Sequence, residues 1–218
     1  MLRSCAFWIL GFLMFIFVSI ILFPPMPGGI RYPGNSKSMQ TARTLVLAEF
    51  SYASDNDGKY PDGRNSVEIC QKLIDGKYVS DPSIFYVPMK GKTKAVAGHA
   101  LGPENVCWDF TVHRDGSGLD MSDPDSIPVL FLTGCRLNYV AGGSATPVDR
   151  ANPIPTYDDS KWWGTLNSEP PGLAVAYKNN GSKFILLDST GLVPKVVPDD
   201  FEAKDKAYRQ VTPDGALP

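Results

Sequence analysis

Residues 42–61 read ARTLVLAEFSYASDNDGKYP, and two signals in this stretch set the architecture around it. The apolar side chains of its first half recur every three or four positions, which is the spacing of one face of an α-helix. Gly58 follows, and glycine suits the left-handed conformation that often closes a helix. The stretch predicts an amphipathic helix over residues 38–54 and then a turn. The expected buried face of this helix consists of Ala42, Leu45, Val46, Glu49, Phe50 and Ala53.

The segment before this helix is strongly apolar. Residues 5–23 carry no charge, and a helix of that length would be roughly 28 Å long, close to the roughly 30 Å of a bilayer's hydrocarbon core. A cleaved signal peptide is the alternative, but its apolar stretch is typically shorter and ends in small residues. Here the run stays bulky up to Phe23 and is closed by two prolines. We therefore expect a transmembrane anchor at residues 1–23, which contacts the membrane through residues 5–23, and a Pro/Gly hinge at residues 24–37.

Charges beside the anchor bear on its orientation. Arg3 and the terminal amine favour a cytoplasmic N-terminus. Arg31, Lys37 and Arg43 favour the opposite by count, but long domains are translocated largely regardless of such charges. We therefore expect a single-pass protein of the inner membrane whose C-terminal domain lies outside the cytoplasm, on the periplasmic side.

The chain changes from helix to strand after the turn. Asn65, with Glu68 three positions later, resembles a capping box, so a second helix is expected at residues 66–75. Apolar and polar residues alternate at 106–112, which is typical of a half-buried strand. Residues 127–133 are almost all apolar and predict a central strand.

The clearest pairing signal is Asn180-Gly181, which lies between apolar runs at 173–177 and 184–187 and predicts a β-hairpin. Because strands follow helices rather than alternate with them, the expected class is α+β, with the amphipathic helix packed on an antiparallel sheet. We assign residues 38–198 to this domain and residues 199–218 to a charged C-terminal tail.

The charge balance excludes one class of partner. The chain has 21 Lys and Arg residues against 23 Asp and Glu residues, whereas a nucleic-acid binder needs a basic patch or stripe. No general acid and base pair and no nucleophile constellation is recognisable. We therefore expect a protein that is not an enzyme and does not bind nucleic acid.

Three segments resemble a known family in their order along the chain. Residues 52–61 are similar to the helix end of type IV pilin-like proteins and type II secretion pseudopilins. Residues 118–131 resemble the middle, and residues 177–194 the last β-hairpin, of the prepilin-like proteins of planctomycetes and verrucomicrobia. The N-terminus is atypical, because no glutamate stands near the start of the apolar run and no prepilin peptidase site is visible.

The resemblance implies a pilin-like domain and a structural role in the bacterial cell envelope or in type II secretion. Such a protein acts by associating with other envelope or secretion proteins. The alternative is a membrane-tethered module that binds a glycan or a protein through the loop 157–163. Its exposed aromatic residues would be Tyr157, Trp162 and Trp163.

Three carboxylates crowd one loop, namely Asp120, Asp123 and Asp125. Hard cations bind several oxygen ligands on flexible loops, so these residues are candidate calcium ligands. Some secretion pseudopilins bind calcium in a loop beside their sheet, and the resemblance extends that expectation to this chain. The alternative is an ordinary solvated turn. No other cofactor is expected.

The cysteines show no zinc-site spacing. In an exported domain, Cys107 and Cys135 on adjacent expected strands form the candidate disulfide. The alternative is that these residues and Cys70 are buried thiols that behave as small apolar side chains.

Overall fold

The computed structural model describes residues 33–89, 91–148, 171–202 and 207–216. Its α-helices are α2 (Pro33–Asp55) and α3 (Ser66–Asp75). Its 3-10 helices are η1 (Pro82–Phe85) and η2 (Pro103–Asn105). Its strands are β1 (Trp108–His113), β2 (Pro128–Leu132), β3 (Cys135–Leu137), β4 (Ala145–Pro147), β5 (Gly172–Tyr177), β6 (Ser182–Leu186), β7 (Tyr208–Thr212) and β8 (Gly215–Ala216).

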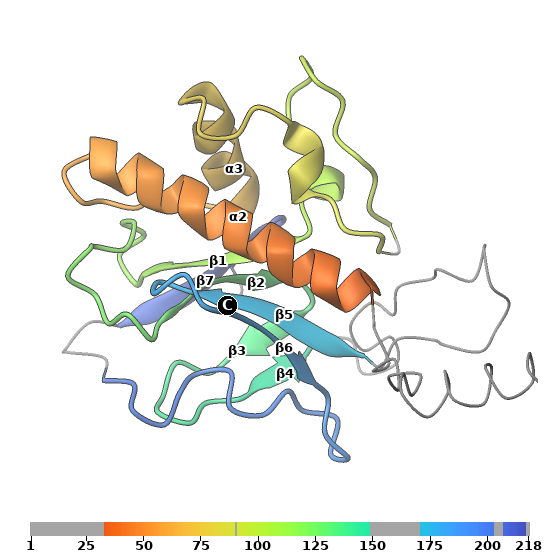
Figure 1. Ribbon diagram of the computed structural model, residues 1–218, viewed down its shortest axis with the longest axis vertical. Coiled ribbons are helices and arrows are strands. Elements are labelled where there is room, and N and C mark those ends of the chain that lie inside the picture. The colour runs from red at the N-terminus through yellow and green to blue at the C-terminus, as the bar shows by residue number, and fades with distance from the viewer. Residues whose placement is uncertain (1–32, 90, 149–170, 203–206, 217–218) are drawn as a thin grey trace, which may run out of the picture. The chain divides into compact units, whose positions relative to one another are not determined.

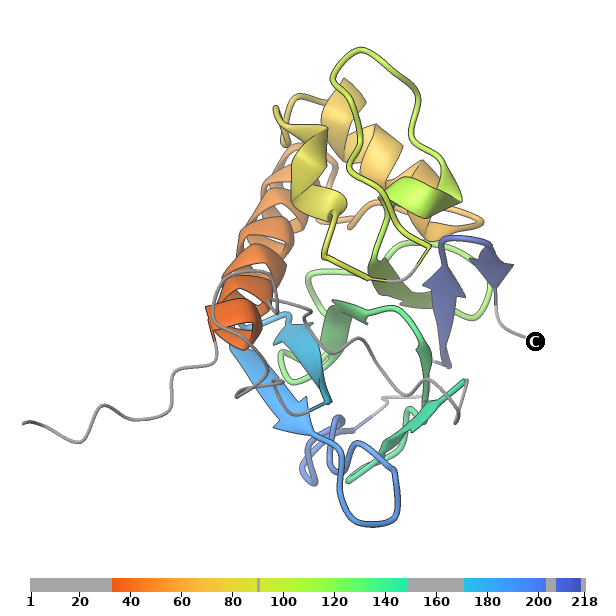
Figure 2. The same ribbon diagram turned by 90° about the vertical axis from the view of Figure 1, so that its right-hand side faces the viewer.

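The strands form one antiparallel sheet of six, in the order β6-β5-β2-β1-β7-β8, and a separate pair, β3-β4. Helices α2 and α3 cover one face of the large sheet, and the β3-β4 pair lies on the other side (Figures 1 and 2). Every residue of β1, β2 and β5 is buried. This explains why residues 127–133 are almost all apolar, since a strand covered on both faces has no solvent side.

Helix α2 lies along β5 and β6 with its buried face on the sheet. It begins at Pro33, inside the predicted hinge 24–37, because proline is tolerated in the first turn of a helix. The prediction for Phe50 was wrong, since this side chain is 47% exposed. Each helical residue advances by about 100°, so Phe50 falls at the edge of the stripe centred on Glu49.

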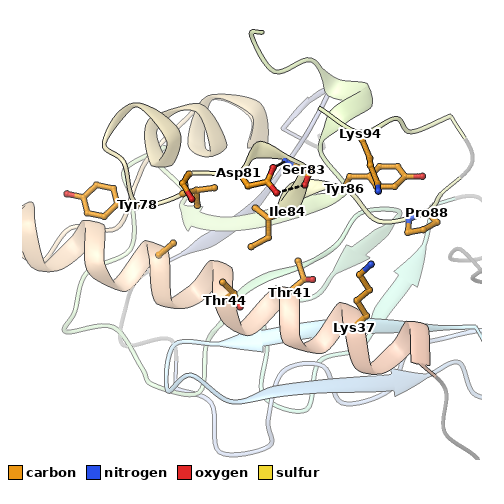
Figure 3. A pocket seen from close by; sticks show the side chains of 13 residues that line it. Lys37, Thr41, Thr44, Tyr78, Asp81, Ser83, Ile84, Tyr86, Pro88 and Lys94 are labelled. Atoms are coloured by element: carbon orange, nitrogen blue, oxygen red, sulfur yellow. Dashed lines mark hydrogen bonds between the residues drawn. The ribbon is translucent and has the colours of Figure 1, made fainter. Parts of the chain in front are cut away.

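Helix α3 confirms the capping signal in the sequence. The Asn65 side chain accepts a hydrogen bond from Glu68 N at 2.9 Å, and the Glu68 carboxylate reaches back to Arg64 N rather than to Asn65 N. The chain then passes through residues 78–88 beside α2, and a pocket lies between the two (Figure 3).

The C-terminal segment differs from the predicted charged tail at 199–218. Strand β7 pairs with β1 from Phe110↔Val211 to His113↔Tyr208 and lies between β1 and the short edge strand β8. The hydropathy pattern of Tyr208–Thr212 does not indicate a strand in the sheet, because Gln210 is polar yet buried. Its amide donates to Asp109 Oδ2 and to the carbonyl of Cys135, both at 2.6 Å, and so joins the two sheets.

No helix in the described part of the chain is both long and apolar enough to cross a membrane. The longest, α2, carries Lys37, Arg43, Glu49 and Asp55 along its length. The predicted fold began with a transmembrane helix, and this part of the prediction is wrong for the described residues, which instead form two α-helices packed on an antiparallel sheet. The predicted anchor at residues 1–23 lies outside the described residues.

Candidate functional site

The candidate site is built on the loop that joins β1 to β2. Strand β1 ends at His113, and a tight turn follows in which His113 N donates to Ser117 O at 2.9 Å. Gly116 has a φ of +93° at this corner, a conformation that glycine adopts without strain. The loop then runs beside the turn after α2, where Tyr60 N donates to Leu119 O at 2.8 Å. The end of α2 thus positions the loop.

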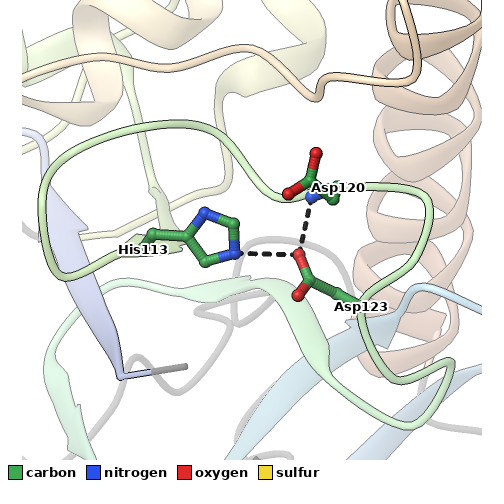
Figure 4. Close-up of side chains that lie close together, drawn as sticks. All are labelled: His113, Asp120 and Asp123. Atoms are coloured by element: carbon green, nitrogen blue, oxygen red, sulfur yellow. Dashed lines mark hydrogen bonds and ion pairs between the residues drawn. The ribbon is translucent and has the colours of Figure 1, made fainter. Parts of the chain in front are cut away.

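Asp123 is the buried centre of this loop. Its Oδ2 atom lies 2.9 Å from His113 Nε2 and accepts a hydrogen bond from Asp120 N at 2.6 Å (Figure 4). Its Oδ1 atom accepts the hydroxyl of Tyr208, from β7, at 3.1 Å. Because the Asp123 side chain is only 1% exposed, these partners replace the water that a carboxylate would otherwise hold.

Asp120 lies at the edge of the same cluster. Its backbone pairs with Lys59 in an isolated β-bridge, and Lys59 Nζ lies 2.6 Å from Asp120 Oδ1. The Asp120 carboxylate is 24% exposed, so this ion pair borders on solvent. The contact joins the site to the turn that follows α2.

His113, Asp120 and Asp123 form a group that could hold a metal ion. One ligand atom from each residue lies within 4.8 Å of the others. Asp125 is not part of this group, although the sequence placed it with Asp120 and Asp123. Its carboxylate is 3.0 Å from Lys178 Nζ, which also donates to the carbonyls of Met121 and Asp123. The candidate metal-binding group in the structure therefore contains His113 in the place that the sequence predicted for Asp125.

Sequence reasoning missed His113 as a member of this group. The separation of ten positions between His113 and Asp123 matches no ligand spacing, and only the return of the loop brings the two together.

A serine, a histidine and an aspartate are linked at this site. Ser117 Oγ lies 3.0 Å from His113 Nδ1, while Asp123 lies on Nε2 of the same ring. Serine hydrolases link the same three residue types, but their serine lies on Nε2 and their aspartate on Nδ1, the reverse of the arrangement at His113. Here the Ser117 hydroxyl donates to Asp115 Oδ1 at 2.7 Å, and Ser117 N donates to the same oxygen. The Ser117 hydroxyl therefore donates its proton to Asp115 within the turn and not to His113. We infer that the contacts among Ser117, His113 and Asp123 have a structural role.

Two tyrosine phenols in and beside the site have raised pKa values. Burial, followed by the nearby Asp123 carboxylate, raises the pKa of the Tyr208 phenol well above its ordinary value. Burial raises the pKa of Tyr60 to about 12. Both phenols therefore remain protonated at neutral pH, and Tyr208 serves as a donor to Asp123.

The predicted disulfide between Cys107 and Cys135 is absent from the structure. Both residues, and Cys70, are free and buried thiols. The sulfur of Cys107 faces the backbone of Val87, whose N and O atoms lie 3.2 and 3.3 Å from it. The side chain therefore points to the segment after η1 rather than to β3.

The aromatic residues of the alternative binding loop, Tyr157, Trp162 and Trp163, lie outside the described residues. No family model matches the chain, and no curated protein or solved structure shows significant similarity to it.

Proposed function

We propose that the chain is a pilin-like, non-enzymatic structural protein of the bacterial cell envelope or of type II secretion, which works by associating with other proteins. The support from the sequence is the ordered resemblance of residues 52–61, 118–131 and 177–194 to pilin-like proteins. The structural observation that carries the proposal is the outward face of α2.

Leu47 and Phe50 form the association surface that we propose. They lie three positions apart on α2 and are 46% and 47% exposed, while the opposite face of the helix is buried on the sheet. Residues at this spacing are neighbours on a helix surface, and paired apolar anchors of this kind dock against a partner helix. Arg43, one turn earlier and exposed, adds a positive charge beside the surface. The occupant that we propose is a helix of another pilin-like envelope or secretion protein.

The test is a photo-crosslinking experiment on the full chain in bacterial cells. A benzoylphenylalanine at position 50 should crosslink to a component of the secretion machinery, identified by mass spectrometry. The single substitution Leu47→Ser should weaken the crosslink, because it removes the apolar side chain beside position 50. It leaves Leu45 and the rest of the buried face of α2 intact. The matched control places the crosslinker at Val96, which is 63% exposed and lies outside α2.

A crosslink of equal yield at position 96, or one insensitive to Leu47→Ser, would overturn the association surface. A circular dichroism melting curve checks that the variant is folded. We expect a change within about 0.5 kcal/mol in the free energy of unfolding, as is usual for exposed positions.

We also propose that Asp120 and Asp123 take calcium weakly, in a structural role. The two carboxylates offer up to four oxygen atoms, which suits a hard cation. An ion would have to displace Lys59 from Asp120 and compete with the donors on Asp123. The expected dissociation constant is therefore about 10⁻³ M, at the weak end of protein calcium sites.

Thermal unfolding with and without calcium tests this second proposal. At about ten times the dissociation constant, calcium should stabilise the fold by about 1.4 kcal/mol. Asp120→Asn should abolish the gain, whereas Asp125→Asn should keep it. Zinc is the comparison ion, because His113 offers an imidazole that zinc prefers. Stabilisation by zinc alone would contradict the assignment to calcium.

A further inference from the structure

A pocket of about 440 Å³ lies between α2 and the segment 78–88. Its volume falls within the roughly 300–1,000 Å³ that is usual for ligand pockets. On the α2 side it is lined by Lys37, Thr41, Thr44 and Ala48, which recur at helical spacing and form one stripe (Figure 3). Neither Leu47 nor Phe50 lines it, so the pocket is separate from the association surface.

Two lysines reach the same end of this pocket from its two sides. Lys37 extends from α2, and Lys94 extends from the opposite wall, where its Nζ atom lies 5.9 Å from the centre of the Tyr86 ring (Figure 3). Within the described residues, neither lysine takes part in an ion pair with a carboxylate. This end of the pocket is therefore positively charged.

Among the described residues that line the pocket, Asp81 carries the one carboxylate, and both of its oxygens accept hydrogen bonds. Asp81 Oδ1 accepts from Ser83 N at 2.9 Å, and Oδ2 accepts from Ser83 Oγ at 2.8 Å. These hydrogen bonds lower the pKa of Asp81, so they hold its charge at the start of η1. The negative charge of Asp81 also acts on Lys94, but the two ammonium groups outnumber this one carboxylate among the described lining residues.

The rest of the pocket wall is largely apolar and held in place. Ile84 and Ala48 contribute aliphatic surface, and Tyr78 stands at the end opposite the lysines. The Tyr78 hydroxyl donates to Asp55 at 2.9 Å, and its ring packs edge-on against Tyr52. A wall fixed in this way lowers the entropy cost of binding, since little has to be ordered by the ligand.

We propose that this pocket binds an extended acidic peptide segment of a partner protein. A glutamate or aspartate carboxylate lies between Lys37 and Lys94, and a neighbouring apolar side chain covers Ile84 and Ala48. Between the two ends, Thr41 offers a hydroxyl group to the peptide backbone, whereas the Thr44 hydroxyl donates to Gln40 O at 3.0 Å and offers only its oxygen as an acceptor. The choice of a peptide over a small anion rests on this pairing of a cationic end with an apolar wall in one pocket.

The test uses the full chain and a fluorescein-labelled peptide of alternating glutamate and leucine, followed by fluorescence anisotropy at low salt. The peptide should bind saturably. Replacing its glutamates by glutamine should weaken binding about five-fold or more, as should the double variant Lys37→Ala/Lys94→Ala. The charge-preserving variant Lys37→Arg/Lys94→Arg should retain most of the affinity. Lys195→Ala, a lysine outside the pocket, is the matched control.

Three outcomes would overturn the proposal. The first is the absence of saturable binding by the folded wild-type chain. The second is binding that does not depend on Lys37 and Lys94. The third is equal affinity for inorganic phosphate alone, which would identify a simple anion site. Loss of the α2 crosslink at position 50 with peptide binding intact would separate a failure of the association surface from a failure of this pocket.

Discussion

Asp109 is a carboxyl group buried between the two sheets, and burial raises its pKa to about 7. Its Oδ2 atom accepts from Gln210, and hydrogen bonding from Thr133 and Gln210 offsets part of the effect of burial on the pKa. Glu49 on α2 is buried as well, and burial raises its pKa well above the ordinary value. Both groups therefore bind a proton more tightly in the folded than in the unfolded chain.

The pH dependence of stability follows from this difference. Between about pH 4 and pH 7, the folded chain holds protons that the unfolded chain has released, so the free energy of unfolding falls as pH rises. Asp109→Asn should flatten this decline by up to a few kcal/mol over the window, measured by urea unfolding at several pH values. An unaltered slope in Asp109→Asn would contradict the protonated state.

The thiols show the same effect of burial. It raises the pKa of Cys107 to about 11 and of Cys135 to about 12, so neither forms the reactive thiolate at neutral pH. We expect iodoacetamide at about pH 8 to label neither residue in the folded chain and both after unfolding. Mass spectrometry of the peptides reads this out. A pair that stays unlabelled until a reductant is added would instead show a disulfide.

At the scale of elements, the turn after α2 and the candidate site loop are locked together by close backbone contact. Gly118 lies directly against the carbonyl of Tyr60, and a Cβ added there would clash with that backbone oxygen. The neighbouring pairing of Lys59 with Asp120 depends on this approach. A side chain at position 118 must therefore push the loop away from the turn.

Gly118→Ala should destabilise the fold by about 2–4 kcal/mol, because the clash is with backbone rather than with a flexible side chain. Gly98→Ala is the control. Its φ of +82° makes alanine strained, but no atom lies within 4 Å of the added carbon. We expect a cost of about 1 kcal/mol there. Chemical denaturation of both variants measures the difference, and equal costs would argue against the clash.

At the scale of the whole molecule, local signals in the sequence were sufficient for some parts. Asn65 and Glu68 marked the start of α3, and Asn180-Gly181 marked the hairpin of β5 and β6, where Asn180 has a φ of 62°. Each signal depends on residues a few positions apart. These elements could be predicted because their cause is local.

The parts that were not predicted have distant causes. Gln210 is buried because Asp109, about a hundred positions earlier, accepts its hydrogen bond. His113 belongs to the candidate site because the loop returns to bring Asp123 against it. A linear pattern shows neither partner, so the sequence predicts only a charged tail at residues 199–218 and gives no signal that His113 belongs to the site.

Asp123 joins three parts of the molecule, so replacing it should lower the free energy of unfolding of the whole domain. Asp123→Ala leaves His113 Nε2, Asp120 N and the Tyr208 hydroxyl without their acceptor. We expect a loss of about 3–5 kcal/mol in the free energy of unfolding. Asp125→Ala should cost about 1 kcal/mol or less, since its side chain is 79% exposed. Urea titration compares the two, and similar losses would contradict the central role of Asp123.

The place of β7 beside β1 has a consequence for biosynthesis. As the chain leaves the ribosome, β1 emerges about a hundred residues before the strand that completes its hydrogen bonding. The Ser66 hydroxyl, at the start of α3, likewise donates to the carbonyl of Val211, which is synthesised much later. Contacts this far apart in sequence form late, because the chain entropy of closing such a loop must be overcome first. The large sheet can therefore be completed only after nearly all of the chain has been made.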